Sequence, residues 1–237
     1  FTFMASAEVI SFIGATPVFV DVDLNTCNMD PRSLEKAIEA IVTYSDSNYP
    51  VPRTETKLVP KCVIPVDLFG LPADYEKINT IAEKYNLFVL EDAAQSFGAT
   101  CKNKKACTLA HAGATSFFPA KPLGCYGDGG AIFTDDDKLA EKLKSIRVHG
   151  KGGDKYDNIR IGINGRLDTI QAAVLLSKLD IFDQEVKNRN RIASYYSEKL
   201  KDHFEVQTIP EGCTSVWAQY SVRSEEHTSE LQSRQSI

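Results

Sequence analysis

The sequence predicts an α/β fold in which helices cover both faces of a mostly parallel sheet. Short apolar segments alternate along the chain with longer segments whose apolar residues recur at helical spacing, and this alternation is typical of parallel strands joined by crossover helices. Residues 87–90 are four apolar residues in succession, which indicates a strand buried on both faces. The expected architecture is a three-layer α/β/α large domain, followed by the start of a small α+β domain.

The elements of the large domain follow from this alternation and from local start signals. Asp30 and Pro31 stand where an N-cap and a first helical residue belong, and three successive carboxylates from Asp135 suit the N-terminus of another helix. Strands are expected at 17–21, 61–66, 87–90, 114–118 and 131–134, and helices at 31–42, 73–85 and 135–148.

The second part of the chain predicts a change of domain. Residues 167–202 predict one long or broken helix that leads away from the sheet, and 204–207 and 215–223 predict the first strands of a second domain. We therefore assign residues 1–180 to the large domain and 181–223 to a connecting helix and the start of the small domain. The stretch from Arg223 onward resembles the translation of a sequencing adapter, so residues 224–237 are expected to be a non-native tail. The alternative is a polar, disordered terminus.

The composition predicts a soluble, cytosolic protein with a sizeable core. The 237 residues are 43% hydrophobic and 25% charged, with a formal net charge of −5. This composition allows a sizeable core and gives no indication of nucleic-acid binding, which needs an excess of basic residues. No apolar run approaches the length of a membrane span, and no signal peptide is visible. Six scattered cysteines lack metal-ligand spacing and predict reduced thiols, with a tight turn between Cys101 and Cys107.

One lysine, Lys121, follows a short apolar segment and stands between Pro119 and Pro122. Reactive side chains collect at the carboxyl ends of parallel strands, and prolines stop the backbone from continuing as strand or helix. Lysine forms Schiff bases with aldehydes, the reaction on which pyridoxal phosphate (PLP) chemistry depends. A lysine in a proline-containing loop can equally be a solvated surface residue, so this hypothesis needs a partner.

Asp92 is the candidate partner, because the strand expected at 87–90 leads directly to it. A PLP enzyme needs a carboxylate against the pyridine nitrogen, since a protonated ring is the electron sink that stabilises a substrate carbanion. The structural alternative is that Asp92 caps the next helix, a common role for aspartate after a strand. The presence of Lys121 further along the chain favours the functional interpretation.

Four motifs carry a resemblance to a known family. They are Glu91-Asp-Ala-Ala-Gln-Ser-Phe-Gly-Ala, Ser116-Phe-Phe-Pro-Ala-Lys-Pro-Leu-Gly, Gly127-Asp-Gly-Gly-Ala and Gly162-Ile-Asn-Gly-Arg-Leu-Asp-Thr-Ile-Gln-Ala-Ala. Their order and spacing resemble those of the DegT-type sugar aminotransferases, PLP enzymes of the aspartate aminotransferase fold, and the resemblance runs from residue 1 to about 223. Within the family, the sequence of residues 116–131 most resembles that of the branch that aminates the C3 ketone of a UDP-linked 2-acetamido-3-oxo-glucuronate.

The resemblance implies a role for each of five residues. Lys121 resembles the Schiff-base lysine that also moves a proton at the substrate carbon. Asp92 resembles the partner of the pyridine nitrogen, and Gln95 resembles the donor to the ring hydroxyl. Ser116 resembles a phosphate ligand, and Phe3 matches the aromatic residue that stacks on the ring. An ordinary strand-end hydroxyl and a core phenylalanine are the structural alternatives for the last two.

The resemblance also implies a homodimer with shared active sites. In the family, the loop that matches Asn164 and Arg166 reaches into the neighbouring subunit. Asn164 is expected to touch the partner's cofactor phosphate, and Arg166 to bind a carboxylate or phosphate of the sugar nucleotide. The alternatives are a turn residue at positive φ for Asn164 and a surface ion pair with Asp168 for Arg166.

The implied reaction transfers an amino group, from a donor expected to be glutamate, to a keto-sugar nucleotide. Relatives with dehydratase chemistry carry His where this chain has Lys121, which favours transfer. Asp67 stands where many relatives have His or Ser. The family's N-terminal phosphate-binding segment is expected to precede this chain, so weak cofactor binding is expected. The alternatives are a PLP enzyme acting on another substrate and a PLP fold that is catalytically dead.

Overall fold

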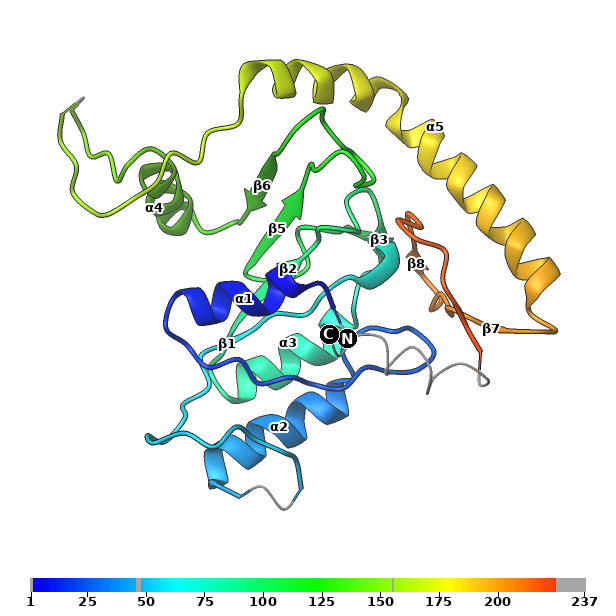
Figure 1. The fold of residues 1–237 in the computed structure, drawn as a ribbon, viewed down its shortest axis with the longest axis horizontal. Coiled ribbons are helices and arrows are strands. Elements are labelled where there is room, and N and C mark those ends of the chain that lie inside the picture. Colours follow the sequence, from blue (N-terminus) through cyan, green and yellow to red (C-terminus); the bar gives the residue numbers. More distant parts are fainter. Residues whose placement is uncertain (1, 46–47, 155, 225–237) are drawn as a thin grey trace, which may run out of the picture.

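The main sheet has four strands, three of them parallel (Figure 1). The computed structural model describes residues 2–45, 48–154 and 156–224, so the expected tail lies almost wholly outside it. The strand order is β1 (Cys62–Val63), β2 (Phe88–Asp92), β5 (Ala112–Ser116) and β6 (Gly130–Phe133). β1, β2 and β5 run parallel, and β6 returns antiparallel to β5. The prediction of a mixed α/β fold with a mostly parallel sheet is therefore confirmed.

Two amphipathic helices, α2 (Pro31–Thr43) and α3 (Tyr75–Lys84), pack against this sheet. The N–H groups of Arg32 and Ser33 donate to the Asp30 carboxylate, which confirms the predicted N-cap. The Asp74 carboxylate likewise accepts from the N–H of Lys77 at the start of α3. The largest core cluster joins side chains of both helices to the buried faces of β1 and β2, among them Leu34, Ile38, Val63, Ile78 and Val89.

A second core lies under the long helix α5 (Thr169–Leu200), which extends along the side of the molecule in Figure 1. Leu175 and Phe182 of α5 pack against Phe117, Leu123 and Cys125. The helix is continuous through residue 180, where the domain boundary is expected. α4 (Asp137–Arg147) is preceded by its N-cap Asp136, whose carboxylate accepts from the N–H groups of Lys138 and Leu139. Within the described residues, no helix is long and apolar enough to cross a membrane.

Small antiparallel sheets complete the fold. β3 (Thr100–Cys101) and β4 (Lys104–Lys105) form a hairpin, and β8 (Cys213–Thr214) pairs with β3. β7 (Glu205–Val206) pairs with β9 (Val222–Arg223). Lys102 and Asn103, both at positive φ, make the tight turn that is expected before Cys107.

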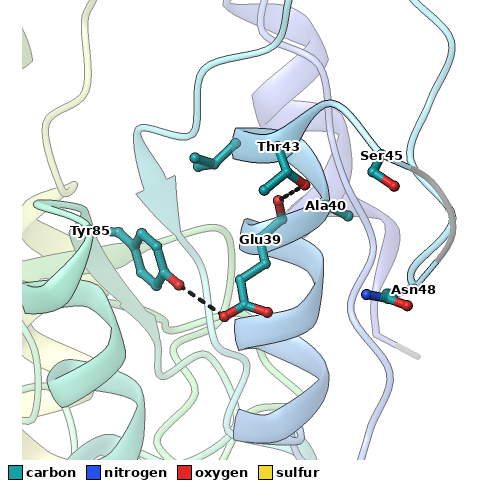
Figure 2. A pocket seen from close by; sticks show the side chains of 7 residues that line it. Glu39, Ala40, Thr43, Ser45, Asn48 and Tyr85 are labelled. Carbon is teal, nitrogen blue, oxygen red and sulfur yellow. Dashed lines mark hydrogen bonds between the residues drawn. The ribbon is translucent and has the colours of Figure 1, made fainter.

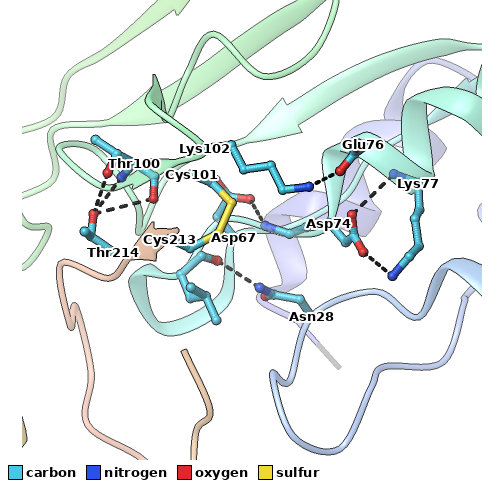
Figure 3. The surroundings of a disulfide bond; sticks show 12 residues. Asn28, Asp67, Asp74, Glu76, Lys77, Thr100, Cys101, Lys102, Cys213 and Thr214 are labelled. Carbon is cyan, nitrogen blue, oxygen red and sulfur yellow. Dashed lines mark hydrogen bonds and ion pairs between the residues drawn. A yellow bond between two sulfur atoms is a disulfide. The ribbon is translucent and has the colours of Figure 1, made fainter. Parts of the chain in front are cut away.

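Three features of the local structure differ from what the sequence predicts. No strand forms at 17–21, because backbone groups of this segment bind the Tyr49 side chain and not a neighbouring strand. The Tyr49 hydroxyl accepts from the N–H of Asp21 and donates to the carbonyl of Phe19. A helix that was not expected, α1 (Met4–Phe12), precedes this segment. The third difference concerns the thiols: Cys101 and Cys213 form a disulfide (Figure 3), because the register of β3 and β8 sets them opposite each other.

Candidate active site

The ends of β2 and β5 bring Asp92 and Ser116 to the same edge of the sheet. Asp92 is the last residue of β2, and Ser116 is the last residue of β5. The parallel register places Asp92 beside Ala114, two residues before Ser116. Both side chains are half-buried, and the Ser116 hydroxyl accepts from the N–H of Phe118 at 3.2 Å. Carboxyl ends of parallel strands are where ligands of α/β proteins bind.

A turn over residues 94–98 follows Asp92 where a helix is expected. The Asp92 Oδ1 atom accepts from the N–H of Ala94 at 3.2 Å, so the carboxylate forms a local turn and does not cap a helix. Gln95 lies in this turn, and its Oε1 atom accepts from the N–H of Phe69 at 2.6 Å. Among the described residues, the Gln95 amide nitrogen makes no hydrogen bond, which leaves it available as a donor.

Lys121 lies in a second turn, between Phe117 and Cys125. Its backbone N–H donates to the carbonyl of Phe118, and the N–H of Cys125 donates to that of Phe117, both at 2.8 Å. The two residues after it, Pro122 and Leu123, are buried and anchor the turn. The Lys121 side chain is half-buried, and its Nζ atom lies 5.9 Å from the centre of the Phe3 ring. The fully solvated surface lysine considered as an alternative does not describe this position.

The start of α1 connects Lys121 with Asp92. Phe3 precedes the helix and is 68% exposed, with Lys121 over its ring. Three residues later, Ser6 donates from its hydroxyl to the Oδ2 atom of Asp92 at 2.6 Å. Ser6 is the residue that sequence reasoning missed. It lies 86 residues from Asp92, and no local pattern marks it, since a serine on a short apolar helix is ordinary.

Asn164 and Arg166 lie apart from these residues, in the exposed loop before α5. The Arg166 Nε atom donates to the Asn164 side chain at 2.8 Å. Neither structural alternative is found: Asn164 is not among the described residues with positive φ, and Arg166 forms no ion pair with Asp168 in the described part of the chain. Within one chain, the loop is therefore not joined to Lys121 or Asp92.

Two hollows among the described residues lie away from Asp92 and Lys121. The larger, about 830 Å³, is bounded by β5, β6, α4 and residues 163–167. The smaller, about 270 Å³, lies at the end of α2 (Figure 2), where the Tyr85 hydroxyl donates to Glu39 at 3.4 Å. Asp92 and Lys121 line neither of these two hollows.

Comparison with known proteins decides the family. Residues 1–236 match the model of the DegT/DnrJ/EryC1/StrS aminotransferase family. The chain belongs to this family. It is 48% identical over 235 residues to the UDP-2-acetamido-2-deoxy-3-oxo-D-glucuronate aminotransferase of Pseudomonas aeruginosa, with 97% of this chain and 59% of the relative covered.

Solved structures of family members share the fold. A DegT DnrJ EryC1 StrS aminotransferase from Brucella abortus is 53% identical and superposes with a TM-score of 0.89, over 99% of this chain and 61% of that one. The ntda protein of Bacillus subtilis, with bound cofactor PMP, is 28% identical with a TM-score of 0.78, over 98% of this chain and 50% of that one. The chain thus spans about three-fifths or less of the length of these relatives.

Proposed function

We propose that this chain is the cofactor-binding part of a PLP-dependent aminotransferase that moves an amino group from an amino acid, glutamate being the expected donor, to a keto-sugar nucleotide. The observation that carries the proposal is the gathering of Asp92, Gln95, Ser116 and Lys121 at the ends of β2 and β5, in a chain of this family. The PMP-bound Bacillus subtilis relative supports the choice of cofactor.

The donors and acceptors of the site fit PLP. The Asp92 carboxylate would accept from the protonated ring nitrogen, and the Gln95 amide nitrogen would donate to the ring hydroxyl. The Ser116 hydroxyl would donate to the phosphate, and the exposed Phe3 ring offers a face for stacking. When bound, PLP supplies an aldehyde that condenses with amines and a protonated ring that withdraws electrons from the substrate carbon.

Lys121 would hold the cofactor covalently through Nζ. The same amine is then the base that moves a proton to and from the substrate carbon. Its turn, closed by two backbone hydrogen bonds and anchored by two buried residues, limits the positions of Nζ. Such restriction is what a proton transfer at one atom requires.

The substrate class rests on the family and on Arg166. The Pseudomonas aeruginosa relative is named for a UDP-linked 3-oxo-glucuronate, and a sugar of this kind carries both a carboxylate and phosphates. The Arg166 guanidinium is exposed and suits bidentate recognition of either group. We therefore propose a UDP-linked 3-keto sugar acid as the substrate.

A second copy of the chain would complete the site. The segment around Asn164 and Arg166 exposes several isoleucines, of which Ile161 is 97% and Ile163 is 64% exposed. An apolar surface of this kind is typical of a protein interface. A homodimer that covers these residues would bring the loop to the partner's sheet edge, as the family resemblance implies.

The proposal is tested by covalent capture. The chain is mixed with PLP, reduced with borohydride and digested, and the modified lysine is identified by mass spectrometry. We expect modification to concentrate on Lys121 and to be accompanied, before reduction, by a visible absorbance band. Modification spread evenly over exposed lysines would contradict the proposal. Turnover is best measured in a chimera in which residues 1–223 replace the matching part of the Pseudomonas aeruginosa relative.

Replacing Ser6 with alanine is expected to slow the proton-transfer steps about tenfold to a hundredfold. The variant loses a short hydrogen bond to the Asp92 carboxylate, and hydrogen bonds to charged groups contribute about 1.5–3 kcal/mol. Ser6→Thr keeps the hydroxyl and is the matched control. The amino-donor half-reaction, followed by absorbance in the chimera, measures both. Equal rates for the alanine and threonine variants would show that Ser6 does not act through Asp92.

Mixing two inactive variants tests the shared site. Lys121→Ala and Arg166→Ala homodimers are both expected to be inactive. A heterodimer of the two has one site with Lys121 from one chain and Arg166 from the other, so activity should return to at most half of the wild-type value per dimer. Heterodimers that form but stay inactive would place Arg166 in its own subunit's site.

A further inference from the structure

Two carboxyl groups that the proposed reaction does not use are buried beside Asp92. Asp67 and Glu91 both have 0% of their surface exposed. Glu91 precedes Asp92 on β2, and the backbone N–H of Asp67 donates to the carbonyl of Asp92 at 3.1 Å. Neither carboxyl takes part in the ion pairs found in the described residues. Two unpaired buried negative charges would be very costly, so one of the two carboxyls is expected to carry a proton. The hydrogen-bond partners of each carboxyl indicate which one.

The partners of Glu91 favour an ionised side chain. Its Oε1 atom accepts from the backbone N–H of Cys107 at 2.6 Å. Its Oε2 atom accepts from the backbone N–H of Leu109 at 2.9 Å. Backbone N–H groups can only donate, so neither could accept a proton carried by Glu91, and an ionised carboxylate is the stronger acceptor for both. The two bonds also tie the end of β2 to the segment before β5.

The partners of Asp67 allow a proton on one oxygen. Its Oδ1 atom accepts from the N–H of Ala73 and from the hydroxyl of Tyr75, both at 2.9 Å. Its Oδ2 atom meets the Ser96 hydroxyl at 2.6 Å. A hydroxyl group both donates and accepts, so a proton on Oδ2 faces no backbone N–H. The charge of Glu91 also acts on the Asp67 carboxyl.

We propose that Asp67 and Glu91 hold a single proton between them, carried on Oδ2 of Asp67 beside the Ser96 hydroxyl, and that this pair positions the turn that bears Gln95. Ser96, which follows Gln95, binds Asp67, and Phe69, two residues after Asp67, binds the Gln95 side chain. Gln95 is thus held from both sides by groups that depend on Asp67. The positioning role rests on the proposed function, whereas the assignment of the proton does not.

The surrounding groups agree with this assignment. Burial, followed by the charge of Glu91, raises the pKa of Asp67 well above its usual range. Burial also raises the pKa of Glu91, but the N–H groups of Leu109 and Cys107 and the Asp67 side chain oppose that rise. The nearby Tyr75 and Cys107 stay uncharged and add no negative charge, because burial and the two carboxyls raise the pKa of Tyr75 well above its usual range and that of Cys107 to about 12. Asp92 adds a further negative charge near Tyr75.

Two isosteric variants of the chain, measured without cofactor, test the proton. Asp67→Asn keeps an acceptor for Ala73 and Tyr75 and places an uncharged N–H donor beside the Ser96 hydroxyl, so its urea unfolding midpoint at neutral pH should stay close to wild type. Glu91→Gln turns an NH₂ group toward a backbone N–H, and an unsatisfied buried donor should lower the folding equilibrium constant about tenfold or more. Equal losses in the two variants, or the reverse order, would overturn the assignment.

The pH dependence and the infrared spectrum give two further readouts. Because the folded pKa of Asp67 is raised, the native state binds a proton that the unfolded chain releases above the ordinary value near 3.8. The wild-type folding equilibrium constant should therefore fall as pH rises above that value, by at most about tenfold per pH unit for one proton, and should be flatter in Asp67→Asn. The wild type should also show the carbonyl band of a protonated carboxyl at neutral pH, and Asp67→Asn should lack it. Unchanged pH slopes, or no such band in the wild type, would contradict the shared proton.

Ser96→Ala separates positioning from protonation. This variant should keep the infrared band but weaken PLP binding, measured as visible absorbance on titration, several-fold, because the Gln95 turn loses its bond to Asp67. Unchanged PLP binding in Ser96→Ala would overturn the positioning role. If the wild-type chain captures no PLP at Lys121, the positioning role fails together with the proposed function, while the proton assignment is still decided by the cofactor-free measurements.

Discussion

Replacing Lys121 with alanine is expected to abolish covalent capture of PLP and to lower transamination by about four orders of magnitude or more, in the range found when a covalent nucleophile is removed. The physical reason is that the proposed Schiff base forms on the Lys121 amine, which the turn after β5 holds over the Phe3 ring. Phe3 precedes α1, the helix from which Ser6 donates a hydrogen bond to Asp92. The expected readouts are loss of the visible band and loss of the borohydride-trapped peptide.

Lys178 is a matched control for that variant. Its Nζ atom is also partly buried, donates to the carbonyl of Gly124 at 2.5 Å and lies 4.7 Å from the centre of the Tyr126 ring. Lys178→Ala removes a comparable lysine from the neighbouring helix, and we expect it to keep the visible band. A Lys121→Ala enzyme with near-normal turnover, or a Lys178→Ala enzyme that loses capture, would contradict the assignment.

The fold was predictable from the sequence where local signals and periodicity agree. α2 has a capping aspartate, a proline at its first position and a strongly one-sided apolar face, and it forms within a residue of its expected bounds. β2 was recognisable as an apolar run that leads to Asp92, but the expectation of burial on both faces is wrong, because buried and more exposed residues alternate along the strand and Phe88 is exposed. In such segments, the backbone preference and the burial pattern favour the same structure.

The errors arise where distant residues decide the local structure. The backbone at Phe19 and Asp21 is held by Tyr49 and not by a neighbouring strand. Cys101 and Cys213 are 112 residues apart, and their pairing follows from a strand register that no local pattern shows. α1 lacks a side-chain cap and has no buried residue, so neither a start signal nor an apolar stripe marks it.

In the candidate site, too, residues within sequence motifs were predicted and residues that act through distant partners were not. The sequence motifs predicted Asp92, Gln95, Ser116 and Lys121, and the structure places them at or just after two adjacent strand ends. Their roles toward a cofactor remain predictions. Ser6 and the buried pair of Asp67 and Glu91 were not predicted to support the site, because their partners come from other elements: Ser6 reaches Asp92, and Asp67 reaches Ser96, 29 residues away.

Replacing Asp92 with asparagine is expected to leave the fold and PLP binding largely intact, yet to slow the proton-transfer steps by several orders of magnitude. Asparagine keeps an acceptor for the N–H of Ala94, and the Ser6 hydroxyl can rotate to accept from the new NH₂ group. The turn that carries Gln95 should therefore survive. What is lost is the negative charge that keeps the ring nitrogen protonated, and loss of that charge removes the electron sink. A fall of about 10⁴-fold is the size found when a buried aspartate that orients a catalytic group becomes asparagine.

The two hydrogen bonds of Asp92 make this variant decisive. If Asp92 serves only to form the turn at Ala94, Asp92→Asn preserves that role and the half-reaction with the amino donor should run at the wild-type rate. If it stabilises the protonated ring, the rate should collapse while the titrated PLP affinity changes little. Ser6 acts through the same carboxylate, so adding Ser6→Ala to Asp92→Asn should slow the reaction much less than Ser6→Ala does alone. Full additivity of the two losses would show that Ser6 and Asp92 act independently, contrary to the 2.6 Å hydrogen bond between them.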